Sequence, residues 1–174
     1  PIGIFALLAK LISTEDISVL NRLIEFAAVV TGTTIFHGAV VLPLLLWIFG
    51  KMNPLTFFKG ARSALITAFA TSSSSATMPL SMKCAQENLG VRPATAGFVI
   101  PLGTQLNMDG TALYEAAAAL FIANLMGLDL TIGQQLIVCM TAMIASLGAP
   151  GIPSAGMVTM IMVLQSVGLP AEAI

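Results

Sequence analysis

The sequence predicts an all-α membrane protein that combines transmembrane helices with two re-entrant helical hairpins and one broken helix. Three observations support this fold class: the apolar composition, two apolar stretches with polar or helix-breaking centres, and an acidic residue inside a third. Of the 174 residues, 57% are hydrophobic and 9% are charged, whereas an ordinary soluble domain has about 25% charged residues. So few charges cannot cover a water-facing surface, and the lipid bilayer is the solvent that fits. The net charge of −1 gives no basic field for nucleic acid.

The first part of the chain predicts the end of one helix and then a complete transmembrane helix. Residues 1–13 are apolar, but about 20 residues are needed to cross the hydrocarbon core. We therefore expect the end of a helix that begins upstream, and we expect the chain to be a fragment of a longer protein. Residues 21–49, which are apolar almost throughout, are long enough to span a membrane with some tilt.

Residues 64–91 predict a re-entrant hairpin. Apolar stretches at 64–71 and 76–82 flank four consecutive serines, Ser72 to Ser75. Neither stretch can span a membrane alone, and serine weakens a helix because its side chain competes for backbone hydrogen bonds. Two short helices that meet at the serines and return to the same face satisfy both constraints.

The second half predicts a broken transmembrane helix and a second re-entrant hairpin. Residues 93–127 are apolar apart from Glu115 and the central segment TQLNMDGT, which covers 104–111. Residues 131–170 have two apolar arms around GAPGIPSAG, at 148–156. Glycine and proline at that density end a helix.

The basic residues orient these elements in the membrane. Lys51, Lys59 and Arg62 precede the first hairpin, and Lys83 and Arg92 follow it. If the hairpin dips in and returns, all five lie on one face, which the positive-inside rule makes cytoplasmic. The first hairpin then opens to the cytoplasm and the second to the exterior. Hairpins that enter from opposite faces are typical of secondary transporters with inverted repeats.

Asp109 is the sharpest functional candidate. A carboxylate in the middle of a membrane helix costs about 3 kcal/mol on insertion scales unless it is paired or binds a cation. Asn107 precedes it by two residues and Gly110 follows it, so the helix is poorly supported there. Exposed carbonyls together with Asn and Asp side chains form an oxygen cage that suits Na⁺. The alternative is a polar kink satisfied by neighbouring helices and water.

Glu115 lies on the helix that resumes after the break, one turn beyond Thr111. Burial favours the neutral form of a carboxyl group, so Glu115 could carry a proton. The alternative is a neutral glutamic acid that only forms hydrogen bonds within the bundle.

The serine tip offers hydroxyl and backbone N–H groups that attract carboxylates, although Thr77 could simply cap the second arm. The glycine-rich segment 148–156 lacks the Lys-Ser/Thr ending of a phosphate loop, so we reject nucleotide binding. His37 has no second histidine or acid at ligand spacing, and we expect a core histidine.

Three motifs together resemble the sodium-coupled dicarboxylate and amino-acid symporter family, which includes the excitatory glutamate transporters and their prokaryotic homologues. The motifs are SSSSATMP, NMDGT and GAPGIPSAG, in the family's order and spacing. The strings PIGIFALLA, LTIGQQL and MVLQSVGLP are similar too, so the resemblance covers nearly the whole chain.

The resemblance implies part of an elevator-type transport domain, with the last core helix missing. The fragment would hold the end of the fifth helix, the sixth, the serine hairpin, the broken seventh and the glycine-proline hairpin, which is the outer gate in this family. The whole protein would be a homotrimer in the plasma membrane, or in the inner membrane of a bacterium.

The resemblance also assigns roles to individual residues. Substrate contacts would come from the following residues: Ser72 (carbonyl), Ser74, Thr111 (hydroxyl), Ile152 and Gly156. One sodium ion would use Gly103 and Asn107, and another the side chains of Asn107 and Asp109. A third would lie between backbone oxygens of two segments: Gln105 and Met108 in one, and Ser146, Leu147 and Ala149 in the other. Glu115 matches the glutamate regarded as the proton carrier in members that transport acidic amino acids.

Two positions depart from the family's pattern. Gln105 stands where many members have Thr, with little expected effect because the family uses the backbone carbonyl there. Pro150 replaces a small residue at the gate tip, where its missing N–H could stiffen the hinge.

The leading hypothesis is symport of an acidic amino acid or dicarboxylate driven by a sodium gradient, with or without a proton. Na⁺, and H⁺ if coupled, are the only cofactors expected. A neutral amino-acid symporter or exchanger of the same family is the alternative. Two other classes are a passive channel with Asp109 as its selectivity element and an intramembrane serine hydrolase that pairs one of the serines with His37.

Overall fold

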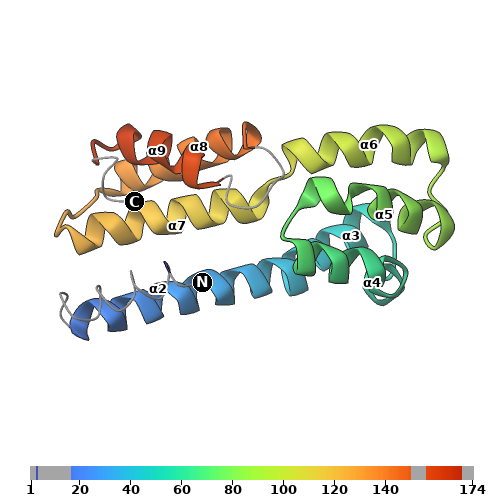
Figure 1. Ribbon diagram of the computed structural model, residues 1–174, viewed down its shortest axis with the longest axis horizontal. Helices are drawn as coiled ribbons and strands as arrows, with labels where there is room; N and C mark the ends of the chain where they lie inside the picture. The colour runs from blue at the N-terminus through green and yellow to red at the C-terminus, as the bar shows by residue number, and fades with distance from the viewer. Residues whose placement is uncertain (1–2, 4–16, 150–155, 170–174) are drawn as a thin grey trace.

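The computed structural model describes residues 3, 17–149 and 156–169, and its elements there are all helices (Figure 1). The predicted all-α class is therefore confirmed for the described residues. The elements are α2 (Ile17–Phe36), η1 (His37–Val41), α3 (Leu42–Gly50), α4 (Pro54–Thr71), α5 (Ser74–Glu87), α6 (Pro93–Leu106), α7 (Asp109–Leu125), α8 (Ile132–Leu147) and α9 (Gly156–Ser166). The helix end expected at 1–13 falls almost wholly outside the described residues, as do Pro150 and Ile152 of the second hairpin.

Helices α2 and α3 are joined end to end by η1, a single π-helical turn. The backbone N–H of Leu42 donates to the carbonyl of His37, five residues earlier. Pro43 follows at once and has no N–H to donate, and a missing donor is a known cause of such irregular turns. Among the described residues, Leu20–Gly50 is the one helical stretch long and apolar enough to cross a membrane.

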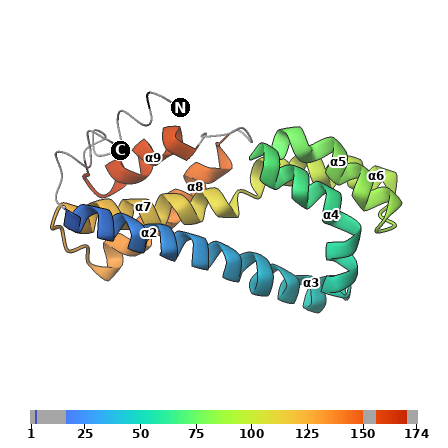
Figure 2. The same ribbon diagram turned by 60° about the horizontal axis from the view of Figure 1, so that its bottom comes forward.

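Helices α4 and α5 form the first hairpin (Figure 2). Ser72 ends α4 in the left-handed conformation, with φ 48°, and its N–H donates to the Ala68 carbonyl at 2.9 Å. Ser73 then caps α5 by accepting from the Ala76 N–H at 3.2 Å. The first arm starts at Pro54, ten residues before the expected boundary at 64, because proline suits the first helical position and Asn53 caps the helix.

The break between α6 and α7 consists of Asn107 and Met108. Their backbone angles, φ −99° and ψ 76° for Asn107 and φ −108° and ψ 45° for Met108, are not helical. The Asn107 N–H donates to the Gly103 carbonyl at 2.9 Å and ends α6. Figure 1 shows α6 over the first hairpin and α7 running away from it beside α2.

Helices α8 and α9 form a second hairpin that packs on α7. Its core is built from buried apolar side chains, among them Val138, Val163, Leu164 and the small Ala119 and Ala142. Alanine at the contact lets the helix axes approach closely. The start of α8 is fixed by a capping box between Thr131 and Gln134.

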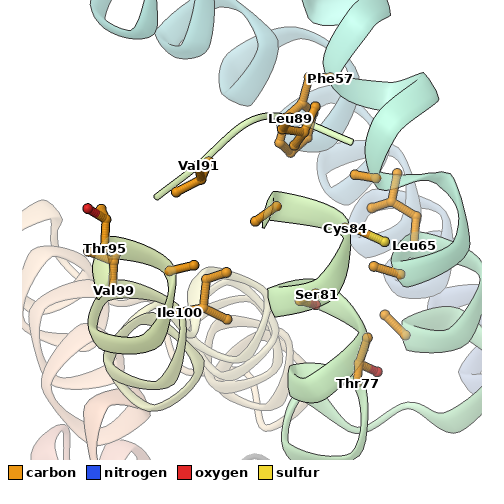
Figure 3. A pocket seen from close by; sticks show the side chains of 15 residues that line it. Phe57, Leu65, Thr77, Ser81, Cys84, Leu89, Val91, Thr95, Val99 and Ile100 are labelled. Carbon is orange, nitrogen blue, oxygen red and sulfur yellow. The ribbon is translucent and has the colours of Figure 1, made fainter. Parts of the chain in front are cut away.

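An apolar cavity of about 410 Å³ lies between α4, α5 and α6 (Figure 3). Leu65, Ile100 and Cys84 line it from the three helices. Thr77 also borders the cavity, but its hydroxyl donates to the Ser73 carbonyl at 2.8 Å. That bond runs from inside α5 back to its cap residue, so the second arm is capped by Ser73 and not, as the alternative had it, by Thr77.

Candidate binding site at the helix break

The turn of the first hairpin, the start of α9 and the break between α6 and α7 come together near the middle of the molecule (Figures 1 and 2). A hollow of about 680 Å³ lies there, lined by Ser72, Gly110, Thr111, Tyr114, Gly156 and Met157. These residues come from the first hairpin tip, the start of α7 and the start of α9. Segments far apart in the sequence thus share one hollow.

Three of the predicted substrate contacts, Ser72, Thr111 and Gly156, line this hollow together. Ser74 is exposed and starts α5, two residues beyond Ser72. Ile152 lies outside the described residues. Described residues from each of the three motifs therefore border one hollow, and their roles in binding remain a prediction.

Helix ends give the hollow its electrostatic character. Helices α5, α7 and α9 begin at Ser74, Asp109 and Gly156, and the first N–H groups of a helix lack intrahelical partners and carry partial positive charge. Helix α6 ends at Leu106, where the last carbonyls carry partial negative charge. The site therefore offers donors to a carboxylate and oxygens to a cation side by side.

Gly156 lets α9 approach α7 closely. A Cβ atom placed on it would lie 3.3 Å from Thr111 Cγ2 and 3.7 Å from Glu115 Oε1. The first of these distances is tighter than ordinary van der Waals contact, so a Cβ at residue 156 would require the Thr111 methyl group or α9 to shift by a few tenths of an ångström.

The candidate sodium ligands lie around the break and at the end of α8. Asn107 and Asp109 are exposed, and Gly103 is partly buried. Helices α6 and α8 are in contact, which brings the segment of Gln105 and Met108 towards that of Ser146, Leu147 and Ala149.

These ligands are oxygen donors with lone pairs to spare. The carbonyl of Gly103 accepts a backbone hydrogen bond from the Asn107 N–H at 2.9 Å, and a carbonyl oxygen has a second lone pair. Within the described part of the chain, His, Cys, Asp and Glu side chains form no cluster of three or more. A single carboxylate with amide and backbone oxygens suits a hard cation such as Na⁺.

His37 contacts Asp109, which the sequence analysis did not foresee. His37 Nε2 lies 3.2 Å from Asp109 Oδ2, and the two side chains are 32% and 43% exposed. The prediction of a core histidine is therefore wrong. His37 is the first residue of the π-turn, and its ring faces the helix break. Pro43 was the available signal of an irregular turn, but nothing in the sequence indicated a partner 72 residues away.

Glu115 is completely buried, with 0% of its surface exposed. Its Oε1 accepts a hydrogen bond from the Thr159 hydroxyl of α9, while Oε2 has no hydrogen-bond partner among the described residues. Thr159 was also missed in the sequence, where one threonine in an apolar arm gives no indication of its partner.

Comparison with known proteins gives a match along the whole chain. Residues 1–174 match the family model described as the sodium:dicarboxylate symporter family. Excitatory amino acid transporter 3 of Mus musculus is 50% identical over 173 residues, which cover 99% of this chain and 33% of that protein. The putative sodium-dependent excitatory amino acid transporter glt-4 of Caenorhabditis elegans is 49% identical over 174 residues, covering 99% of this chain and 35% of the relative.

Excitatory amino acid transporter 1 of Homo sapiens is 48% identical over 176 residues, covering all of this chain and 32% of the relative. The chain thus spans about a third of the length of these relatives, which are named as transporters. The resemblance inferred from three motifs is confirmed: the chain belongs to the sodium:dicarboxylate symporter family.

Proposed function

We propose that the full-length protein is a secondary-active symporter that uses a sodium gradient to take up an acidic amino acid or dicarboxylate. The hollow lined by Ser72, Thr111 and Gly156 carries this proposal, because it adjoins helix N-termini that suit carboxylates and a broken helix that suits cations. Family membership supports the same function. Glu115, buried beside the hollow, favours an acidic substrate over the neutral amino-acid alternative.

In this proposal the substrate contacts the two hairpins and α7 together. Ser72 uses its carbonyl and Thr111 its hydroxyl, while Ser74 and the N–H groups of the adjoining helix starts receive substrate carboxylate. Ile152 and Gly156 hold it from the second hairpin. A substrate that touches all three segments draws the hairpins together, so binding and closure are one event.

Sodium organises the break before the substrate binds. One ion uses Gly103 and Asn107, and another uses the side chains of Asn107 and Asp109. A third ion lies between two segments. Gln105 and Met108 belong to one, and Ser146, Leu147 and Ala149 belong to the other. A cation next to Asp109 offsets the cost of its charge in the membrane, and ligands on α6 and α8 connect sodium binding to the second hairpin.

Transport would follow from the opposed hairpins. Helices α5, α8 and α9 have 14, 16 and 11 residues, fewer than the roughly 20 required to cross a bilayer, which supports two re-entrant hairpins. The transport domain would move as a body, in an elevator motion within a homotrimer, with a proton carried on Glu115.

The function is tested with the full-length protein in proteoliposomes. Asp109→Asn is expected to reduce sodium-driven uptake of labelled aspartate or glutamate at least tenfold, because the amide keeps the size of the side chain but not its charge. Asp129→Asn, in the exposed segment after α7, is the matched control and should behave as wild type.

Unchanged sodium dependence in Asp109→Asn would count against the ion site. Uptake that does not concentrate substrate would indicate the passive channel instead, and concentrative uptake that survives dissipation of the sodium gradient would indicate the proton as the driving ion.

A further inference from the structure

Thr159 occupies an unusual position in the second hairpin. It is 5% exposed, and its hydroxyl lies between two acceptors on different elements. One is Oε1 of Glu115 on α7, and the other, at 3.2 Å, is the carbonyl of Gly156 at the start of α9. Gly156 in turn lines the hollow proposed for the substrate.

A hydroxyl group has one hydrogen, so Thr159 can donate to only one of these acceptors at a time. When Glu115 is neutral, its carboxyl O–H can donate to Thr159 Oγ1, and Thr159 is free to donate to the Gly156 carbonyl. When Glu115 is charged, it has no hydrogen to give, and the carboxylate is the stronger acceptor. Thr159 then donates to Glu115, and the Gly156 carbonyl loses this donor.

We propose that Thr159 is a positioning residue that passes the protonation state of Glu115 to the start of α9 at the substrate hollow. The inference rests on the proposed proton co-transport and names the residue that links it to the gate. Protonation of Glu115 completes the chain Glu115–Thr159–Gly156, in which the Gly156 carbonyl receives the Thr159 hydroxyl at the start of α9. Release of the proton turns that hydroxyl towards Glu115, so the contact between α7 and α9 stays while the Gly156 carbonyl loses a donor at the substrate hollow.

The surroundings of Glu115 leave Thr159 as its direct partner. Helix α9 has no ionisable side chain, and α8 has only Cys139, which is exposed. On α2, Arg22 and Glu25 border a different hollow, together with Ala117 and Leu120 of α7. The other ionisable side chains near this helix are Tyr114 on α7 itself, Asp129 beyond its end, and the contacting pair of His37 and Asp109 at its first residue.

The link is tested in proteoliposomes by measuring sodium-driven uptake of labelled glutamate, and the accompanying proton entry, between pH 5.5 and 8.5. Thr159→Val keeps the shape of the side chain and removes the hydroxyl. It is expected to reduce the ratio of the highest to the lowest uptake rate over this pH range at least threefold. The sodium concentration for half-maximal uptake should change less than twofold. Thr159→Ser restores the hydroxyl and is expected to restore the profile.

Two further variants separate the hydroxyl from packing. In a Glu115→Gln background, Thr159→Val should not change the pH profile any further, because the side chain at residue 115 then has no carboxyl proton to gain or lose. Thr33→Val is the matched control, since the Thr33 hydroxyl donates within its own helix to the Val29 carbonyl at 2.7 Å. If Thr159→Val does not assemble, Thr159→Ala replaces it in both backgrounds.

Each remaining outcome has one meaning. A wild-type profile in Thr159→Val, or equal changes in the Val and Ser variants, would overturn the role of Thr159 and leave proton co-transport standing. Sodium-driven uptake by the wild type with no proton entry would overturn proton co-transport and this inference with it, and leave sodium symport standing.

Discussion

Asp109 is held from two directions. As the first residue of α7 it lies where a helix N-terminus favours negative charge, and His37 reaches its Oδ2 from the π-turn. A neutral imidazole can donate one N–H to a carboxylate, which leaves Oδ1 available for a cation. The histidine therefore orients the proposed sodium ligand.

Replacing His37 should weaken sodium binding rather than substrate binding. In the full-length protein, His37→Ala is expected to raise the sodium concentration for half-maximal uptake about fivefold, because Asp109 loses the donor that orients it. His37→Gln keeps a donor at nearly the same reach and should stay closer to wild type. The measurement is uptake against sodium at saturating substrate, and equal values for both variants would contradict the orienting role.

The sequence could indicate single residues but not their partners. Asp109 and Asn107 stood out because an acid in an apolar stretch has few explanations, and the motifs placed Thr111 and Gly156 at the site. His37 and Thr159 were missed because each meets its partner across 72 or 44 residues. Such contacts depend on how one helix is rotated against another, which hydrophobic periodicity leaves open when helices are apolar all round.

At the scale of the elements, the approach of α9 to α7 depends on the absence of a side chain at Gly156. Gly156→Ala is expected to lower apparent substrate affinity about tenfold with little effect on sodium affinity, because the added methyl group meets Thr111 Cγ2. Gly133→Ala in α8 is the control, since a Cβ there meets nothing within 4 Å. Competition binding with unlabelled substrate measures both, and equal affinities in the two variants would contradict the close approach.

Element boundaries followed local chemistry where it was strong. The break at Asn107 and Met108 lies inside the expected polar centre, and the first hairpin turns at the expected serines. The start of that hairpin was expected at 64, where the apolar stretch begins, whereas α4 also includes Lys59 and Arg62 before it. A cap at Asn53 and proline at the next position outweighed the charges.

At the scale of the whole molecule, the hairpins should open to opposite sides of the membrane. With the native cysteines replaced, Cys84 and Cys139 among them, single cysteines report each side: one at Glu87, the last residue of α5, and one at Asp129, before the second hairpin. The five basic residues around the first hairpin favour the cytoplasm, so an impermeant thiol reagent added outside should label Asp129→Cys alone. Glu87→Cys should react only after permeabilisation, and labelling of both from outside would contradict the topology.

Much of the surface of the described helices is apolar, which favours contact with lipid or with other protein over contact with water. Large apolar side chains such as Phe69, Phe49 and Trp47 are 91%, 79% and 63% exposed, and contiguous apolar surface of this kind marks contact with lipid or protein. The chain spans about a third of the length of these relatives. Sequence composition indicated the solvent correctly, but it carries no information on which faces meet lipid and which meet other helices.

The π-turn His37–Val41 also constrains how the chain tolerates change in length. A π-turn holds one residue more than the α-turn it replaces, so α2–η1–α3 has one residue in surplus. Deleting one residue between 38 and 41 would allow an uninterrupted α-helix whose two ends still face nearly the same way, because four α-helical residues turn through about 400° and the π-turn spreads that turn over five. The face that α3 presents to α4 would be kept, so this helix should accept a single deletion there, whereas a deletion elsewhere in α2 or α3 would rotate everything beyond it by about 100°.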